Sequence, residues 1–172
     1  MRLFLLVVVV VLLGALGTSC VRSNGTLSNN TFRKSHATYT LGKVPEGWHR
    51  VSLRGADIAY MYGKDGSTLL INSKCEELED TPLLALTFHL VLGMTEVSMI
   101  ESKSVPNSQR EGLISTVEAK LDGVKRKLRM FVLKKDLCIY DIVLATRPDK
   151  FDEHVDAFDS VLKGFNVPGV KL

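Results

Sequence analysis

The sequence predicts an α+β fold in which an antiparallel sheet of about six to seven strands has helices packed on it. Short alternating segments follow one another between residues 48 and 74 and again between residues 97 and 146, separated by turn residues such as Asp122-Gly123. A nearly uninterrupted apolar segment, residues 83–94, separates the two groups of strands. The segment from residue 148 to 163 carries apolar residues at helical spacing.

The first 19 residues are typical of a secretory signal peptide. Arg2 precedes an apolar run at residues 3–13, and small residues then lead to Cys20. The run is shorter than the roughly 20 residues that a membrane-spanning helix needs. Residues 16–20, Leu-Gly-Thr-Ser-Cys, are similar to a bacterial lipoprotein signal, in which the cysteine becomes the lipid-modified first residue. We therefore expect Cys20 to carry palmitate or a related acyl chain. The alternative is a secreted protein that is cut nearby, with Cys20 incidental.

Three segments follow from this reading: a lipoprotein signal peptide at residues 1–19, a lipidated cysteine with a flexible tether at residues 20–36, and a single α+β domain at residues 37–172. The tether is predicted because residues 21–36 are rich in Ser, Asn, Thr and Gly and show no apolar period. About 150 residues remain after the signal peptide, which is the length of one domain.

Charge excludes general nucleic-acid binding. The chain has 22 basic and 19 acidic residues, and removing Arg2 leaves 21 against 19, a net charge of +2. A nucleic-acid-binding domain usually presents a strongly basic face. Export from the cytoplasm argues in the same direction.

Two cysteines remain if Cys20 is lipidated. In an oxidising compartment paired thiols tend to form disulfides, so we predict a bond between Cys75 and Cys138. The alternative is two buried free thiols that never meet. The chain has no Cys-x-x-Cys motif, which argues against a thioredoxin-type redox site.

The register of the central strands follows from the turns. Asp122-Gly123 favours a two-residue hairpin that pairs residue 121 with 124. A three-residue turn at 134–136 would then pair residue 130 with 140 and set Arg129 beside Asp141. This register aligns one apolar face, made by Met130, Val132, Cys138, Tyr140 and Ile142. The basic residues then gather on or beside the other face: Lys125, Lys127, Arg129, Lys134 and Lys135.

Such a basic patch could contact anionic lipid headgroups or an acidic partner, although a solvated face explains it more simply. Two helices complete the predicted domain. The helix at residues 83–94 is apolar nearly all round, which predicts burial on a broad face. The C-terminal helix carries a stripe that we expect on the apolar face of the strands: Phe151, Val155, Phe158, Leu162 and Phe165.

Catalytic and metal-binding patterns are missing from the sequence. It holds no G-x-S-x-G, H-E-x-x-H, Walker or Gly-rich dinucleotide motif. Its histidines, at positions 36, 49, 89 and 154, form no chelating pair along the chain. The sequence therefore predicts no catalytic residue, no metal site, no cofactor and no enzymatic activity.

The order of elements, with Val-Pro-Glu-Gly-Trp at residues 44–48 and Phe-x-x-Val-Leu-x-x-Phe at residues 158–165, resembles PsbP-like α/β/α sandwiches. More specifically, the chain resembles an uncharacterised group of bacterial lipoproteins with a cysteine before the middle helix and a Cys-x-Tyr-Asp strand, here residues 138–141. The resemblance covers about residues 39 to 166. It implies a binding or assembly role and carries over no active site.

These observations predict a membrane-anchored lipoprotein that acts as a non-enzymatic binding or assembly module. The expected location is the bacterial cell envelope, facing the periplasm, with the outer membrane favoured over the inner. Expected partners are the membrane, through the lipid on Cys20, and an envelope protein or lipid. The alternative function is a carrier of a small apolar or lipid ligand in a cleft between the middle helix and the sheet.

Overall fold

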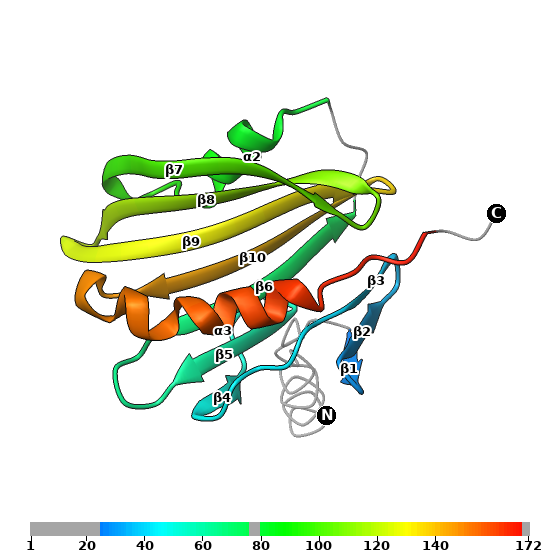
Figure 1. Cartoon of the computed structure of the whole chain (residues 1–172), viewed down its shortest axis with the longest axis horizontal. Coiled ribbons are helices and arrows are strands. Elements are labelled where there is room, and N and C mark those ends of the chain that lie inside the picture. Colours follow the sequence, from blue (N-terminus) through cyan, green and yellow to red (C-terminus); the bar gives the residue numbers. More distant parts are fainter. Residues whose placement is uncertain (1–24, 76–79, 170–172) are drawn as a thin grey trace, which may run out of the picture.

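The computed structural model describes residues 25–75 and 80–169 and contains a seven-stranded antiparallel sheet with a helix on each face (Figure 1). The strand order is β4-β5-β6-β10-β9-β8-β7. The strands are β4 (Trp48–Val51), β5 (Ile58–Tyr62), β6 (Thr68–Cys75), β7 (Thr95–Asn107), β8 (Arg110–Leu121), β9 (Val124–Lys135) and β10 (Cys138–Thr146). The helices are α2 (Leu83–His89) and α3 (Phe151–Lys163), the latter preceded by the 3-10 turn η1 (Pro148–Lys150). The predicted fold class is therefore confirmed.

A second, three-stranded sheet occupies part of the predicted tether. It consists of β1 (Thr26–Ser28), β2 (Thr31–Lys34) and β3 (Ala37–Thr40). Phe32 and Tyr39 are fully buried, and their rings stack 5.1 Å apart. The prediction of a flexible tether to residue 36 is thus wrong for residues 26–34. Cys20 and the signal segment lie outside the described residues.

The tether prediction failed because this segment folds as a short hairpin that needs only a few apolar residues. Asn29 and Asn30 both adopt positive φ, at 47° and 57°, as a tight two-residue hairpin turn requires. One large aromatic side chain from β2 and one from β3 then reach the core, while the Thr, Arg and Lys side chains between them face outward or half-outward. The polar composition of the segment concealed this arrangement.

The β8–β9 hairpin has the predicted register. Leu121 pairs with Val124, and the pairing continues without a slip to Gly112 opposite Leu133. Asp122 and Gly123 take positive φ at the turn, as expected for Asp-Gly.

The β9–β10 hairpin differs from its predicted register by three residues. Its turn is Asp136-Leu137, both at positive φ, so Cys138 pairs with Lys135 and Met130 pairs with Val143. An odd shift turns one strand over, so Met130 and Tyr140 lie on opposite faces of the sheet. Arg129 pairs with Leu144 and not with Asp141. The prediction assumed one apolar face, whereas helices cover both faces and each needs its own apolar set.

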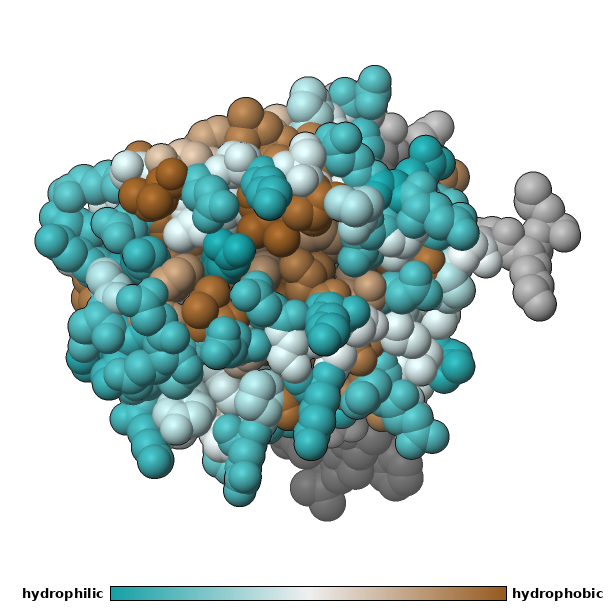
Figure 2. All heavy atoms as spheres, viewed as in Figure 1, coloured by the Kyte–Doolittle hydropathy of each residue, from teal (hydrophilic) through white to brown (hydrophobic). Residues whose placement is uncertain are grey.

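The main core lies between the sheet and α3. Phe158 and Val161 of α3 are fully buried there with Phe131 of β9 and Ile142 and Leu144 of β10. Figure 2, in the same view, shows further apolar side chains in the area between α3 and β8.

A smaller core lies on the opposite face, beneath α2, where Val91 packs with Val117, Leu128 and Met130. The C-terminal helix was predicted on the single apolar face of the strands. That face is divided between the two sides of the sheet: α3 packs against Tyr140 and Ile142, as predicted, whereas Met130 lies on the opposite side beneath α2.

Cys75 and Cys138 face each other across β6 and β10, with their sulfur atoms 2.03 Å apart. The predicted pairing is therefore confirmed at disulfide distance. The bond closes a loop with a sequence separation of 63 residues. In the chain-entropy model a loop of this length contributes about 4 kcal/mol to stability.

Candidate functional site

Helix α2 and the turns after it expose three of the apolar side chains that were predicted to be buried, namely Leu84, Phe88 and Leu92. The helix ends at His89, and tight turns continue the chain to Met94 through hydrogen bonds from Leu90 N to Thr87 O and from Leu92 N to His89 O. Only Leu86 and Thr87 are buried within α2 itself. The prediction of a broadly buried helix from 83 to 94 is therefore wrong in length and in burial.

The outward side of α2 carries a stripe at four-residue spacing. Leu84 is 46% exposed, Phe88 43% and Leu92 76%. Leu121 and Val124, at the β8–β9 turn, are also exposed and lie on the same side of the sheet as α2, because they continue the alternation of Ala119 and Leu128. We call these residues the α2 surface: Leu84, Phe88, Leu92, Leu121 and Val124. Apolar side chains over α2 and β7 are also visible along the upper edge in Figure 2.

The space beneath α2 is filled. Val91 is buried there, and Leu90 and Met94 pack against the same cluster of sheet residues. A ligand cleft between α2 and the sheet was the basis of the predicted carrier function. The packing of this interface favours a docking surface on the outside of α2 over a cavity beneath it.

The α2 surface is electrically neutral. Residues 81–95 contain no Asp, Glu, Lys or Arg. At the start of the helix Asp80 pairs with Lys134 at 3.3 Å, and after it Glu96 pairs with Lys120 at 2.6 Å. Both acidic side chains are largely exposed. The surface is thus an apolar stripe with one ion pair at each end.

The neighbouring edge of the sheet is protected against pairing with another strand. Strand β7 is exposed along almost its whole length but has irregularities between Thr95 and Ser98 and between Met99 and Glu101. Pro106 lacks a backbone donor near its end. Bulges, charges and proline are the devices by which native edge strands avoid further pairing. Strand addition is therefore a poorer use of this region than docking on α2.

The predicted basic patch forms only in part. Lys127 and Arg129 lie on the α3 face, where Lys127 sits 4.5 Å from the centre of the Phe151 ring and Arg129 lies 3.3 Å from Glu101. Lys134 lies on the α2 face, while Lys135 is buried and donates hydrogen bonds to the carbonyl oxygens of Ser108 and Val167. Lys125 is exposed near the β8–β9 turn. Lys125, Lys127 and Arg129 thus share one face of β9, as predicted, but acidic side chains pair with Lys127 and Arg129, while Lys134 lies on the other face and Lys135 is buried.

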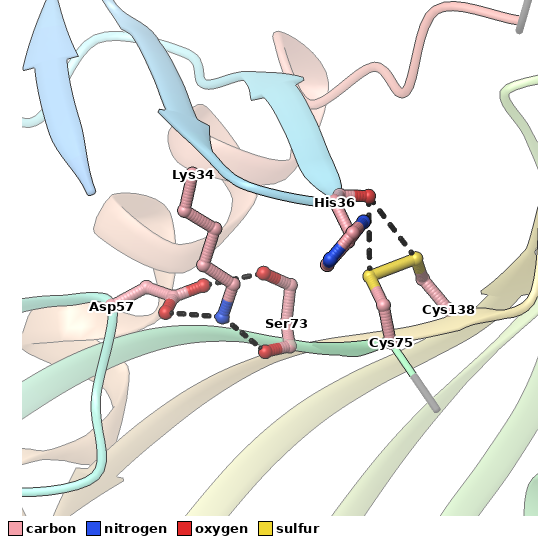
Figure 3. Close-up of a disulfide and its surroundings, with 6 residues drawn as sticks. All are labelled: Lys34, His36, Asp57, Ser73, Cys75 and Cys138. Carbon is pink, nitrogen blue, oxygen red and sulfur yellow. Dashed lines mark hydrogen bonds and ion pairs between the residues drawn. A yellow bond between two sulfur atoms is a disulfide. The ribbon is translucent and has the colours of Figure 1, made fainter. Parts of the chain in front are cut away.

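A buried polar cluster joins the small sheet to the large one (Figure 3). Asp57 accepts hydrogen bonds from Lys34 Nζ at 2.7 Å and from Ser73 Oγ at 2.5 Å. It also accepts one from Tyr39 Oη at 3.3 Å. Burial, followed by the nearby Asp57 charge, raises the pKa of Tyr39. The carbonyl oxygen of His36 lies 3.3 Å from the Cys75 sulfur. Each polar group is bonded within the protein, so we assign the cluster a structural role.

A second polar cluster lies between the β5–β6 turn and α3. His154 Nε2 lies 2.7 Å from Asp65 Oδ2, and a Glu153 carboxylate oxygen lies within 4.8 Å of both atoms. No local sequence pattern predicts this group, because the fold brings together residues 65 and 154, which are 89 positions apart in the chain. Two ligands of one zinc ion lie about 3.4 Å apart. The 2.7 Å contact between His154 and Asp65 is shorter than this and is a hydrogen bond. The Glu153 carboxylate accepts a hydrogen bond from Lys150 Nζ at 2.5 Å.

The rings of Trp48 and Tyr62 pack against His154, at 5.3 and 4.6 Å between ring centres. Although burial of the carboxyl opposes it, the hydrogen bonds from His154 and from the Ser67 backbone lower the pKa of Asp65 to about 2. Sequence reasoning had no signal for this cluster.

No protein-family model matches the sequence, and no curated protein matches it. The solved structures do show similarity. The cyanobacterial PsbP protein (CyanoP) of Synechocystis sp. PCC 6803 aligns with a TM-score of 0.54 at 14% identity, covering 90% of this chain and 98% of that one. The chain has a PsbP-like fold.

Two further structures share this fold. LpqN of Mycobacterium tuberculosis, described as involved in cell envelope biogenesis, aligns with a TM-score of 0.59 at 9% identity, covering 84% of this chain and 89% of that one. The Ran-binding protein Mog1p of Saccharomyces cerevisiae aligns with a TM-score of 0.55 at 10% identity, covering 78% of this chain and 91% of that one. At these identities the similarity establishes the fold alone. Within residues 25–75 and 80–169, no helix is long and apolar enough to cross a membrane.

Proposed function

We propose that this chain is a lipid-anchored, non-enzymatic binding or assembly module of the bacterial cell envelope. The observation that carries the proposal is the α2 surface, which leaves a neutral apolar stripe open on an otherwise packed domain. Exposed apolar clusters rimmed by polar residues are characteristic of protein interaction sites. The envelope role described for LpqN and the Ran-binding role of Mog1p make a binding role for the same fold reasonable.

The anchor is proposed on the sequence at Cys20. With strand β1 beginning at Thr26, the segment from the lipid to the folded domain is six residues long and spans at most about 20 Å. The domain would therefore stay close to the bilayer. In Figure 1, β1 lies near the β4 and β5 end of the large sheet, and α2 lies near the β7 end. The α2 surface would therefore point away from the anchored side, toward partners in the periplasm.

Lipidation is tested by growth of the producing bacterium with labelled palmitate. We expect label on the wild-type chain and none on Cys20→Ala. Unchanged labelling of the variant would contradict an anchor at Cys20.

The binding role is tested by photo-crosslinking in cells. A photoreactive phenylalanine analogue replaces Phe88 in the full chain, and a matched control places it at Leu137, which is 76% exposed on the β9–β10 turn. We expect a discrete covalent adduct from position 88 and none from 137. Adding Leu84→Asp and Leu92→Asp should abolish the adduct, because both charges fall within the stripe. Equal labelling at both positions, or at neither, would contradict a docking role for α2.

A further inference from the structure

Charge is divided unevenly along the described chain. Residues 25–75, which form the small sheet and strands β4 to β6, contain seven basic and three acidic residues, a net charge of +4. Residues 80–169 contain twelve basic and thirteen acidic residues, a net charge of −1. The balanced composition of the whole chain therefore conceals a positively charged part of the domain.

Two of the three acidic residues in this positively charged part are held inside the protein. Asp57 is buried and pairs with Lys34 at 2.7 Å, and the Asp65 carboxylate is bonded to a buried histidine at 2.7 Å. Only Glu46 exposes its carboxylate to solvent. Apart from Lys74 at the end of β6, five exposed basic residues remain, and none of them forms an ion pair with another described residue: Arg33, Lys43, Arg50, Arg54 and Lys64.

These five residues, which we call the basic edge, lie along one border of the molecule. Strand β4, which carries Arg50, is the outermost strand of the large sheet at this end. Arg54 and Lys64 lie on the loops that precede and follow β5. The ion pair between Lys34 and Asp57 fixes the small sheet beside them. In Figure 1 these blue, cyan and teal segments form the lower border, and hydrophilic side chains project along that border in Figure 2.

The anchor proposed at Cys20 would bring this border to the bilayer. Arg33 pairs across the small sheet with Thr26, the first residue of β1, and Lys43 follows β3 of the same sheet. The segment from the lipid to β1 spans at most about 20 Å, which keeps Arg33 near the membrane surface. The part of the domain with the most uncompensated positive charge is therefore the part that the anchor holds beside the lipid headgroups.

Anionic phospholipid is the partner that this charge fits. Each Lys or Arg beside an anionic membrane surface strengthens the contact about fivefold, so several side chains act together although each contributes little. The attraction falls off within about 10 Å at moderate salt, so it requires the short distance that the tether imposes. An acidic protein fits less well, because it would have to enter the narrow space that the tether leaves between the domain and the bilayer.

We propose that the basic edge binds anionic phospholipid headgroups and thereby fixes the orientation of the anchored domain on the membrane. The inference rests on the anchor in the proposed function and adds an electrostatic membrane contact to it. An acyl chain combined with a polybasic patch is a known two-part mode of stable membrane attachment. With the basic edge on the bilayer, the α2 surface near β7 stays open to partners.

The contact is tested with the full lipidated chain, reconstituted into vesicles of phosphatidylcholine alone or mixed equally with phosphatidylglycerol. A polarity-sensitive fluorophore is attached at Leu53→Cys, because Leu53 is 40% exposed and lies between Arg50 and Arg54. Acylation of Cys20 and the native disulfide leave the added cysteine as the only free thiol. We expect a blue shift of the emission in the anionic vesicles and none in the neutral ones. High salt should reverse the shift without any substitution, because the screening length falls to about 3 Å near 1 M ionic strength.

Two controls locate the contact on the molecule. The fluorophore at Ile100→Cys, 56% exposed on β7 at the opposite edge of the sheet, should give the same emission in both kinds of vesicle. Arg50→Glu combined with Arg54→Glu should abolish the shift of the first probe. Lys103→Glu combined with Arg110→Glu changes the net charge equally, at exposed positions on β7 and β8, and should leave the shift intact.

Three results would overturn the inference: equal emission from position 53 in both kinds of vesicle, a shift that survives the reversal of Arg50 and Arg54, or a shift that both charge reversals abolish equally. Flotation with neutral vesicles reports the anchor separately. A chain that floats but shows no shift would leave the anchor and the α2 surface standing. A chain that does not float with neutral vesicles would contradict the anchor, and the inference with it.

The acidic protein is excluded by the same design, because the vesicles contain no other protein. A photoreactive residue at position 53 should give no protein adduct in cells. A discrete adduct there, together with equal emission in both kinds of vesicle, would assign the basic edge to a protein and overturn the lipid contact.

Discussion

At the scale of single residues, the fold shifts the pKa values of the Asp141 and Asp65 carboxyl groups in opposite directions. Burial, followed by the negative charge of Asp57, raises the pKa of Asp141 to about 6. Between pH 4 and 6 the folded chain holds a proton that the unfolded chain has released. The free energy of unfolding therefore falls as pH rises through this window, and Asp141 opposes folding at neutral pH.

Asp141→Asn should therefore stabilise the domain at pH 7. We expect the free energy of unfolding to rise by about 1–2 kcal/mol, less than the whole shift implies, because the side chain keeps some contact with water. The gain should vanish near pH 4. Urea denaturation of the two proteins at both pH values measures it. A variant that is less stable than the wild type at pH 7 would contradict the assigned environment of Asp141.

Asp65 should behave in the opposite sense. Its pKa of about 2 lies below the ordinary value of 3.8, so its contribution is present above pH 4 and is lost as pH falls toward 2. Asp65→Asn should lower the free energy of unfolding at pH 6 by about 1 kcal/mol, which is less than the full pKa shift implies because solvent screens the pair. The two proteins should approach equal stability near pH 2. A constant difference between them from pH 6 to 2 would contradict this assignment.

At the scale of elements, the small sheet gives the clearest contrast between a linker and a folded segment. Arg33 and Lys34 would be rapid trypsin sites in a flexible tether. In β2 they directly follow the buried Phe32, and Lys34 is bonded to Asp57. We expect both bonds to resist limited digestion until the domain unfolds, as mass spectrometry of the fragments would show. Cleavage after Arg33 or Lys34 in the native protein would contradict the three-stranded sheet.

The elements that sequence predicted well are those whose signals are local. Asp122-Gly123 determined the β8–β9 turn and its whole register, because few residues accept positive φ at both positions. The β9–β10 turn uses Asp136 and Leu137, and an exposed leucine at positive φ has no comparable local signal. Its position is set by the pairing of β10 with β6, including Cys138 with Cys75, which is a long-range effect.

At the scale of the whole molecule, the sequence did not reveal how many faces of the large sheet are covered by helices. Composition predicted one buried face and a buried middle helix, whereas two helices cover two faces and α2 is too short to bury all its leucines. The α2 surface could not be predicted because Leu84, Phe88 and Leu92 resemble core residues in any pattern. The Asp65–His154 contact was equally hidden, since 89 residues separate its two members.

The central claim is that this domain assembles with a partner through the α2 surface. The most direct measurement is native electrophoresis of mildly solubilised envelopes that contain the wild-type chain, Phe88→Asp or the matched variant Leu137→Asp. We predict that the wild type and Leu137→Asp migrate as an assembly larger than one chain and that Phe88→Asp migrates as a monomer. A monomeric wild type, or an assembly that survives Phe88→Asp, would contradict the claim.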